Sequence, residues 1–428
     1  MKIIPINHPL ITSVNVPGSK SLTNRALLIA SLANGKTTLT NALFSDDSKY
    51  FAQALQTLGF DIQLDETNHK MIVNGLGGKI PSQKAELFIG NAGTAARFLS
   101  AFLTLANGEY IIDGDARMRE RPIGDLIVSL RQLGVNIESK NNCPPVKISA
   151  RGLPGGKTKV AGNISSQFLS ALLMVAPYAK SPIEIELITE LNSKPYVDMT
   201  IEIMKDFGVE IERQAYQSFK IPITNYQLPI TNYQIESDAS AASYFFAAPA
   251  ICGGSVRVEN ISKNSKQGDI KFLDVLTQMG CIVKEANNSI IVNRPQGSSI
   301  VGIDIDMRDI PDTAQTLAVI APFANSPTRI RGIASARVKE TDRVSATCTE
   351  LKRLGVQVEE HQDGMTIYPC QNFKPATIQT YNDHRMAMAF SLIGLRFDGV
   401  TIENPNCVSK TFPNYFEVLD ELRKQVVR

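Results

Sequence analysis

A unit of about 73 residues, repeated along the chain, constrains the fold more than any other feature of this sequence. Six apolar, Ala-rich stretches each end in a turn of small residues. The turns lie at Gly35, Gly108, Ser181, Gly254, Ser326 and Gly399, which are 73, 73, 73, 72 and 73 residues apart. Fourteen positions before them, at the starts of the stretches, are Ser21, Thr94, Gln167, Ser240, Asp312 and Arg385. Such regularity indicates one supersecondary unit used six times.

A second series of glycines lies between these turns. Each follows a helix-like run and precedes a short alternating apolar run, at Gly59, Gly134, Gly208, Gly280 and Gly355. Glycine suits the residue just past a helix, because it can enter the left-handed conformation that closes the last turn. The alternation after it is typical of a half-buried strand. We therefore predict helix, strands, helix and strand in each unit, with the last helix over residues 415–422.

Composition and net charge give no sign of a nucleic-acid, metal or membrane partner. The 428 residues are 43% apolar and carry a net charge of +2, which gives no reason to expect nucleic acid or another polyanionic partner. The six cysteines and four histidines are scattered, so we expect reduced thiols and no metal site. The sequence has no signal-peptide pattern and no apolar run of membrane-spanning length. We expect a cytoplasmic protein with no membrane association.

A tandem heptad occupies residues 222–235, where the third unit gives way to the fourth. It is Pro-punctuated and β-prone, and we interpret it as an exposed hairpin or linker inserted at the surface. Three units on each side would form two similar domains.

The first helix start, residues 16–25, has features of an anion site. A helix N-terminus offers unpaired N–H groups and a positive dipole end. Gly18 permits close approach, and Lys20, Ser21 and Arg25 add charge and a hydroxyl. The spacing is not that of a Walker loop. A capped helix with solvated basic residues remains an alternative.

The next two starts continue this pattern. Asn91 would cap the second helix, and Gly93 would expose backbone N–H to a ligand. Downstream, Arg117, Arg119 and Arg121 form an arginine run suited to carboxylate or phosphate, or else simply a solvated charged segment. The third start adds two hydroxyls and an amide, from Ser165, Ser166 and Gln167.

Carboxylates appear at the helix starts of the C-terminal half. We interpret Asp342, Asp383, Asp46 and Asp47 as helix caps. Asp312 and Glu340 are better catalytic candidates, because each lies among cations that would hold anionic substrates. If the helix starts share one cleft, it would gather two carboxylates and seven cations: Lys20, Arg25, Arg121, Lys339, Arg343, Arg385 and Lys410. That combination predicts group transfer between anionic substrates by positioning, charge stabilisation and proton transfer.

Nine motifs in order along nearly the whole chain resemble the 5-enolpyruvylshikimate-3-phosphate synthase family of enolpyruvyl transferases. They are VPGSKSLTNRALL, GNAGTAARFL, RMRERPIGDL, SSQFLSALLM, SKPYVD, IPDTAQTLA, RVKETDR, YNDHRMAMAFSL and KTFPNYF. The resemblance implies an α/β fold, a two-domain inverse α/β barrel with three repeats per domain. We place the domains at 20–236 and at 1–19 plus 237–428, with a hinge near 18–21 and 235–240.

The resemblance also implies the reaction, in which enolpyruvyl passes from phosphoenolpyruvate to the 5-hydroxyl of shikimate 3-phosphate with release of phosphate and without cofactor or metal. Asp312 would accept the hydroxyl proton, Glu340 would protonate the methylene carbon, and Lys20 would share in proton transfer. Implied ligands of shikimate 3-phosphate are Lys20, Ser21, Arg25, Ser165, Ser166, Gln167, Ser193, Tyr196, Asp312, Ser335 and Lys339. Implied ligands of phosphoenolpyruvate are Lys20, Gly93, Thr94, Arg121, Gln167, Arg343, Arg385 and Lys410. We expect a monomer.

Two positions depart from the family pattern. Ser335 stands where Asn is common, and the shorter side chain makes fewer hydrogen bonds. Phe98 stands where many members have Pro, which could shift the helix that carries Gly93. Because Gly93 has no side chain to crowd the phosphoenolpyruvate pocket, we expect glyphosate sensitivity.

Two alternatives come from different functional classes. The sister enzyme that uses UDP-N-acetylglucosamine typically has Lys-Asn where this chain has Lys20-Ser21, and it has a cysteine on the loop that corresponds to 111–121, where this chain has none. A catalytically inactive anion-binding or nucleic-acid-binding scaffold would have no use for Asp312 and Glu340, and the chain lacks the aromatic interleaving that single-strand binding favours. Phosphate release that depends on shikimate 3-phosphate would distinguish all three.

Overall fold

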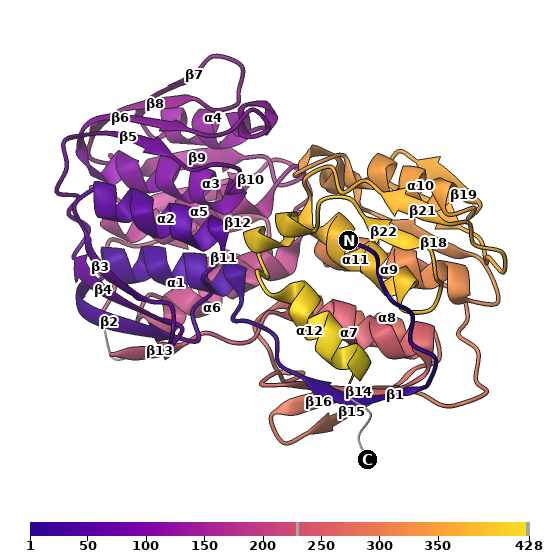
Figure 1. The fold of residues 1–428 in the computed structure, drawn as a ribbon. Helices are drawn as coiled ribbons and strands as arrows, with labels where there is room; N and C mark the ends of the chain where they lie inside the picture. Colours follow the sequence, from indigo (N-terminus) through magenta and orange to yellow (C-terminus); the bar gives the residue numbers. More distant parts are fainter. Residues whose placement is uncertain (228–230, 425–428) are drawn as a thin grey trace. The chain divides into compact units, whose positions relative to one another are not determined.

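The computed structural model describes residues 1–227 and 231–424, which form two compact α/β units (Figure 1). Unit 1 comprises Met1–Pro17 and Glu236–Arg428, and unit 2 comprises Gly18–Ile235. Each unit has its own hydrophobic core. None of the described helices is both long enough and apolar enough to span a membrane.

Unit 2 contains three four-stranded sheets and six α-helices in the part of the chain that is described. The sheets are β13-β2-β4-β3 (Asn232–Gln234, Asn34–Thr40, Lys70–Leu76, Asp61–Asp65), β5-β6-β8-β7 (Lys84–Phe88, Asn107–Asp113, Val146–Arg151, Asn136–Ser139) and β11-β12-β10-β9 (Glu212–Gln214, Ser218–Ile221, Ile183–Leu187, Gly156–Val160). The helices are α1 (Lys20–Leu32), α2 (Asp46–Thr57), α3 (Gly93–Phe102), α4 (Gly124–Gln132), α5 (Ser166–Val175) and α6 (Lys194–Asp206).

Unit 1 has two four-stranded sheets and a pair of strands among its described residues. They are β1-β14-β16-β15 (Leu10–Val14, Gly254–Glu259, Ser289–Arg294, Ile282–Ala286), β17-β18-β20-β19 (Asp304–Asp306, Thr328–Arg331, Gly364–Ile367, Val358–His361) and β21-β22 (Ala376–Ile378, Val400–Ile402). The α-helices are α7 (Ala239–Cys252), α8 (Phe272–Gln278), α9 (Ala314–Ile320), α10 (Arg343–Arg353), α11 (His384–Gly394) and α12 (Tyr415–Lys424), and short 3-10 helices η4 (Gly268–Lys271), η5 (Pro311–Thr313), η7 (Ala334–Val338) and η8 (Pro405–Lys410) lie between them.

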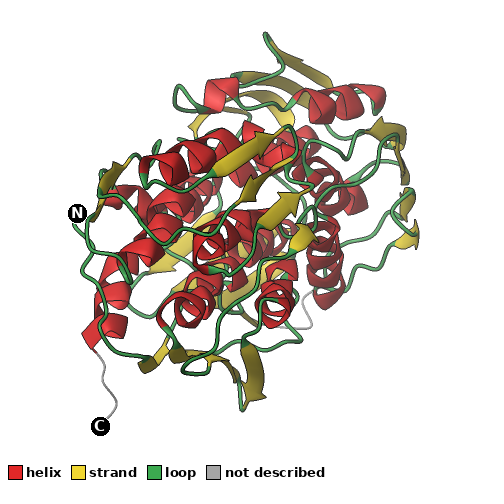
Figure 2. Ribbon diagram, turned by 90° about the vertical axis from the view of Figure 1, so that its right-hand side faces the viewer, coloured by secondary structure: helices red, strands yellow, loops and turns green. Residues whose placement is uncertain are grey.

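The five four-stranded sheets share one pairing scheme. In each sheet one inner strand follows the first helix of a predicted unit; these strands are β2, β6, β10, β14 and β18. This strand pairs in parallel with an edge strand and antiparallel with the second inner strand. The second inner strand pairs antiparallel with the other edge strand. The pair β21-β22 is parallel. Figure 2 shows the strands as short separate groups among the helices, not as one continuous sheet. A shared scheme is the expected product of a repeated unit, although the count of six units stays a prediction.

Helix burial separates two kinds of helix, as the sequence pattern suggests. Every residue of α3 and of α11 is buried, including the polar residues Arg97, His384 and Arg385. The amphipathic helices α2 and α12 bury only one face. The enclosed helices contain the six repeated positions. Each repeated position is the second residue of its helix, and these helices are α1, α3, α5, α7, η5 and α11. The repeat therefore places equivalent helix starts inside each unit.

The predicted glycine turns are confirmed. Gly59, Gly134, Gly208, Gly280 and Gly355 all have positive φ, between 80° and 103°, directly after α2, α4, α6, α8 and α10. The helix predicted over 415–422 is α12.

The interpretation of residues 222–235 as an exposed surface insertion holds for seven of the eleven described residues of the segment, which are exposed, but it is wrong for the two tyrosines. The Tyr226 ring is 2% exposed, and its hydroxyl donates to the Met174 carbonyl at 2.9 Å. Residues 232–234 form β13, which pairs with β2, and the Tyr233 hydroxyl donates to Asp206 at 3.0 Å. Both heptad tyrosines are therefore structural, because an amphipathic ring is stable when buried with its hydroxyl bonded. Residues 228–230 of the heptad lie outside the described residues.

Candidate functional site

The carboxylate of Asp312 lies at the centre of a cationic cluster in unit 1. Lys339 Nζ lies 2.5 Å and Arg343 Nη1 lies 3.1 Å from Asp312 Oδ1, while Arg385 Nη2 lies 2.8 Å from Oδ2. Burial alone would raise the pKa of Asp312, but the attraction of Arg385, Lys339 and Arg343 holds it well below its usual range. Asp312 is therefore an ionised group with a side chain only 15% exposed, and an ionised carboxylate can accept a proton.

Arg343 connects this cluster to two further acids. Its Nη2 donates to Glu340 Oε2 at 2.8 Å and its Nε donates to Asp383 Oδ2 at 2.7 Å. Burial would lower the pKa of Arg343, but Asp383, Glu340 and Asp312 raise it above its ordinary value. One planar guanidinium thus holds three carboxylates by its fork of donors.

Glu340 has a second cation beside it, because Lys410 Nζ lies 3.9 Å from its Oε1. Both side chains are buried. Glu340 lies two residues after the end of η7, and Lys410 is the last residue of η8. Burial of the ammonium group lowers the pKa of Lys339, the other lysine of the cluster. The structure therefore brings together Asp312, Glu340, Lys339, Arg343, Arg385 and Lys410, as the sequence predicts for the C-terminal half.

The interpretation of Asp342 and Asp383 as caps is confirmed. Asp342 accepts from Ser345 N at the start of α10, and Asp383 accepts from Arg385 N at the start of α11. Asp383 has a second role that the cap interpretation missed, because it is fully buried against Arg343.

Arg25 organises the candidate site of unit 2. Its Nε donates to Thr200 Oγ1 at 2.7 Å, and its Nη2 reaches the Tyr196 carbonyl at 3.3 Å and Ser170 Oγ at 3.4 Å. Its Nη1 donates to the carbonyl of Ser21 at 3.1 Å, one turn earlier on α1. Burial lowers the pKa of Arg25 to about 10, which leaves the guanidinium charged at neutral pH. A buried cation in this setting is suited to an anionic ligand.

Phe98 lies against this guanidinium. The Cζ atom of Arg25 is 5.2 Å from the centroid of the Phe98 ring, which is fully buried in α3. The departure at residue 98 thus places an aromatic face beside Arg25, an arrangement that favours a cation.

Lys20, at the first residue of α1, lies 3.4 Å from Asp47. The sequence suggested that Asp46 and Asp47 cap α2, and this prediction is wrong. Ser45 is the N-cap, and the buried Asp47 carboxylate instead balances the charge of Lys20.

Of the arginine run, only Arg121 is buried. Arg117 pairs with Glu120 and Arg119 pairs with Asp113 at the surface, so the solvated alternative holds for these two. The predicted cap of α3, Asn91, is wrong, because the N-cap is Ala92. The side-chain oxygen of Asn91 instead accepts a hydrogen bond from Arg121 Nη1 at 2.8 Å.

Gly93 is needed beside Arg121 for steric reasons. A Cβ at Gly93 would lie 2.5 Å from Arg121 Nη2. The absent side chain therefore makes room for the guanidinium itself.

The remaining predicted ligands lie at helix starts. Ser165 caps α5 by accepting from Gln167 N, and Gln167 Nε2 lies 3.4 Å from Thr94 Oγ1. Ser193 is the N-cap of α6 in the left-handed conformation, with φ of 57°. Ser166 is buried at the first residue of α5, Tyr196 lies half-buried in the first turn of α6, and Ser335 lies half-buried in η7.

Residues that sequence reasoning missed are mainly partners of the predicted cations. They are Asp47, Ser170, Thr200 and Asp383. Ser170 and Thr200 are each four residues after a predicted ligand, Ser166 or Tyr196, and so lie on the same helical face. That spacing could have identified them.

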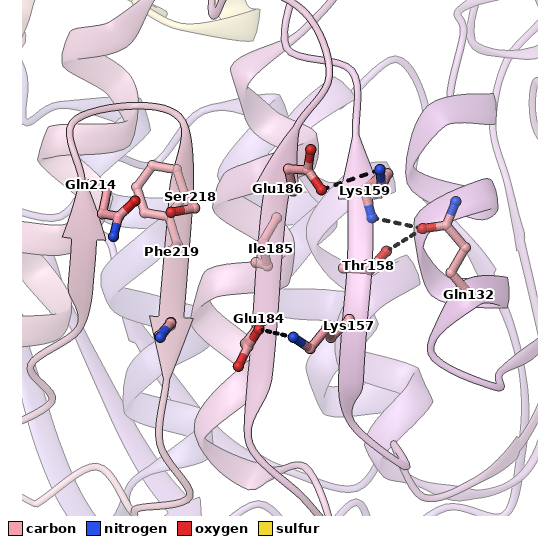
Figure 3. Close-up of a pocket in the computed structure, with 11 residues that line it drawn as sticks. Gln132, Lys157, Thr158, Lys159, Glu184, Ile185, Glu186, Gln214, Ser218 and Phe219 are labelled. Carbon is pink, nitrogen blue, oxygen red and sulfur yellow. Dashed lines mark hydrogen bonds and ion pairs between the residues drawn. The ribbon is translucent and has the colours of Figure 1, made fainter.

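A surface depression of about 560 Å³ lies elsewhere, on the sheet β11-β12-β10-β9 (Figure 3). Lys157 pairs with Glu184 at 2.8 Å and Lys159 pairs with Glu186 at 3.3 Å across its floor. No predicted site residue lines it. Within residues 1–227 and 231–424, no group of three or more His, Cys, Asp or Glu side chains is placed to hold a metal ion.

Comparison with known proteins gives one consistent result. The family model described as EPSP synthase (3-phosphoshikimate 1-carboxyvinyltransferase) matches residues 4–419. The chain is 50% identical over 411 residues to the 3-phosphoshikimate 1-carboxyvinyltransferase of Marinomonas sp. (strain MWYL1), with 96% of each chain covered. It is 48% identical over 427 residues to the chloroplastic enzyme of Brassica napus, covering 96% of this chain and 83% of the relative.

A solved structure of EPSP synthase from Acinetobacter baumannii has a TM-score of 0.80 at 26% identity, covering 98% of this chain and 97% of that one. The two-domain α/β fold and the reaction family predicted from the motifs are therefore confirmed. This chain belongs to the EPSP synthase (3-phosphoshikimate 1-carboxyvinyltransferase) family.

Proposed function

We propose that this chain transfers the enolpyruvyl group of phosphoenolpyruvate to the 5-hydroxyl of shikimate 3-phosphate. Membership of the family supports this reaction. The observation that carries it is the ionised, partly buried Asp312 held among three cations, with Glu340 on the guanidinium of Arg343. Such a cluster suits proton transfer next to anionic substrates.

The reaction is an addition followed by an elimination. The 5-hydroxyl oxygen forms a bond to C2 of phosphoenolpyruvate, Asp312 accepts the hydroxyl proton, and Glu340 gives a proton to the methylene carbon C3. The C2–O bond to phosphate then breaks, phosphate leaves with the electron pair, and C3 returns one proton to the carboxylate of Glu340. The product is an enol ether plus phosphate, with no net redox change. Lys20 shares in proton transfer.

The low pKa of Asp312 is a property of the arrangement without substrate. A phosphate or carboxylate bound beside Lys339, Arg343 and Arg385 would offset the field of these cations. The pKa of Asp312 would then rise, and the carboxylate would become a better proton acceptor once the anions are bound.

Ligand roles are proposed for each unit. In unit 2, Ser21, Arg25, Ser165, Ser166, Gln167, Ser193 and Tyr196 would bind shikimate 3-phosphate, while Lys20, Gly93, Thr94, Gln167 and Arg121 would bind phosphoenolpyruvate. In unit 1, Lys339 and Ser335 would bind shikimate 3-phosphate, and Arg343, Arg385 and Lys410 would bind phosphoenolpyruvate. The buried, hydrogen-bonded setting of Arg25 and Arg343 supports their assignment as fixed anion ligands.

The test is phosphate release with both substrates present. We expect D312N and E340Q each to lower kcat by at least about 100-fold, because each removes one proton transfer. The control variant D304N changes a half-exposed aspartate paired with Arg331 and should keep full activity. Release that requires UDP-N-acetylglucosamine in place of shikimate 3-phosphate would contradict the proposal.

Herbicide response, location and assembly follow as secondary proposals. Gly93, which leaves space beside Arg121, supports competitive inhibition by glyphosate against phosphoenolpyruvate. Indifference to millimolar glyphosate would refute this. We propose a cytoplasmic protein that is a monomer; cell fractionation can test the location, and size-exclusion chromatography with light scattering can test the oligomeric state.

A further inference from the structure

Ser240 is the only one of the six repeated helix starts without a place in the proposed reaction. The structure shows its partner, because Ser240 Oγ donates a short hydrogen bond to Asp269 Oδ2. Asp269 lies in η4 and is 3% exposed. Its neighbour Gln267 accepts from Ala239 N at 3.0 Å, so two side chains of this segment hold the first turn of α7.

Asp269 lies close to the cluster around Asp312. Ser240 and Tyr244 are four residues apart on α7 and share one face of that helix. The Tyr244 hydroxyl accepts from Arg385 Nη1 at 3.4 Å, and Arg385 Nη2 contacts Asp312 at 2.8 Å. Two side chains one turn apart on α7 therefore contact Asp269 and Arg385: Ser240 binds Asp269, and Tyr244 binds Arg385.

The charges that act on Asp269 are unbalanced. They come from Asp238 at the cap of α7, from Asp312 on η5 and from Arg385 on α11, while the exposed Lys271 follows on its own segment. Burial, and then repulsion by Asp312, raise the pKa of Asp269 to about 6, which the hydrogen bond from Ser240 partly opposes. Near neutral pH this site therefore gains or loses a negative charge within the field of Asp312.

We propose that Asp269, held by Ser240, is a positioning residue whose negative charge opposes the surrounding cations and thereby sustains Asp312 as the proton acceptor. The inference rests on the proposed function, since it assigns that role to Asp312. With Asp269 ionised, Asp312 holds a proton more readily, and Arg385 attracts both carboxylates. With Asp269 protonated, Lys339, Arg343 and Arg385 act on Asp312 alone, and Asp312 becomes a poorer base.

The test compares kcat/KM as a function of pH in the wild type and three variants of the full chain, measured by phosphate release, because this ratio reports ionisation of the free enzyme. The wild type should lose activity on the acid side with an apparent pKa of about 6. D269N keeps an oxygen for the Ser240 hydroxyl but no charge, so kcat/KM should fall about tenfold at pH 8 and the acid limb should disappear. S240A removes the hydrogen bond that favours the ionised form, so the limb should move to higher pH. The control D274N alters an exposed aspartate of α8 and should leave the profile unchanged.

The structural alternative predicts a different result. If Asp269 only holds α7 in place, D269N would lower the melting temperature and leave the acid limb where it is, and this outcome would overturn the proposal. A wild type that releases no phosphate would refute the proposed function instead.

A thermodynamic cycle of D269N and D312N tests the coupling without any activity. Repulsion between the two carboxylates predicts that D269N stabilises the wild type more than it stabilises D312N at pH 8. Equal effects in both backgrounds would overturn the inference.

Discussion

Loss of Arg343 should strongly destabilise this molecule. Four hydrogen bonds join its guanidinium to Asp312, Glu340 and Asp383, at 2.7 to 3.3 Å. Replacing it with Met would leave three carboxylates short of a cation in a buried setting. Removing one partner of a buried ion pair costs roughly 3–5 kcal/mol, so R343M should lower the free energy of unfolding by about that amount.

The matched control is R331M, which removes an arginine that pairs with Asp304 at 2.6 Å. Both side chains are largely solvated, at 40% and 54% exposure. An exposed pair contributes under about 1 kcal/mol. Urea unfolding followed by far-ultraviolet circular dichroism suits the comparison, because the chain has no Trp to report on unfolding by fluorescence. The first transition is the one to read, since two compact units need not unfold together.

The loss in R343M should also depend on pH. The pKa of Asp312 is held below its ordinary value by Arg385, Lys339 and Arg343, after burial has opposed them. The corresponding stability is present above the unfolded pKa of about 4 and is lost as pH falls through the folded pKa. The penalty should therefore be full at pH 7.5, remain nearly full down to about pH 4, and shrink only as pH falls below about 4. Equal penalties for R343M and R331M, or a penalty in R343M that does not change with pH, would refute this reasoning.

Two further outcomes concern unit 2. G93A should raise the KM for phosphoenolpyruvate with little change in melting temperature, because the new Cβ would displace only the flexible end of Arg121; an unchanged KM would contradict this. Y226A should destabilise by about 3–5 kcal/mol, whereas I223A in the same heptad, at a side chain 54% exposed, should stay within about 0.5 kcal/mol. Similar losses in both variants would mean that Tyr226 is not a structural anchor.

The periodic features of the fold were predictable because they depend on local chemistry. A positive φ after a helix is a position that only glycine adopts without strain, so Gly59 and Gly355 identify helix ends from sequence alone. The heptad tyrosines were not predictable. Their burial against Tyr178 and Phe207 comes from tertiary packing, which overrides the exposed character of a Pro-punctuated segment.

The candidate cations were predictable for a similar reason, and their partners were not. Lys20 lies at a helix start that the repeat marks, and Arg121 belongs to an arginine run whose composition suits anion binding. Asp47 and Asn91 each had a plausible local role as a cap, and sequence reasoning gave them that role. In the structure both bind a cation instead, because a buried charge without a counter-charge or hydrogen bonds is more costly than an uncapped helix end.

The repeat also explains which side chains of a unit meet. Gln167 contacts Thr94, Arg385 contacts Asp312 and Ser243 contacts Thr316, and each pair is 73 residues apart. Equivalent positions touch because equivalent helices pack side by side, so a substitution at one start acts directly on its counterpart in the next unit. A residue of a neighbouring repeat can therefore change the pKa of a catalytic group without itself contacting the substrate. Ser240 extends this logic, since it has kept a small hydroxyl where its counterparts are Asp312 and Arg385, and that hydroxyl holds the carboxylate of Asp269 within their field.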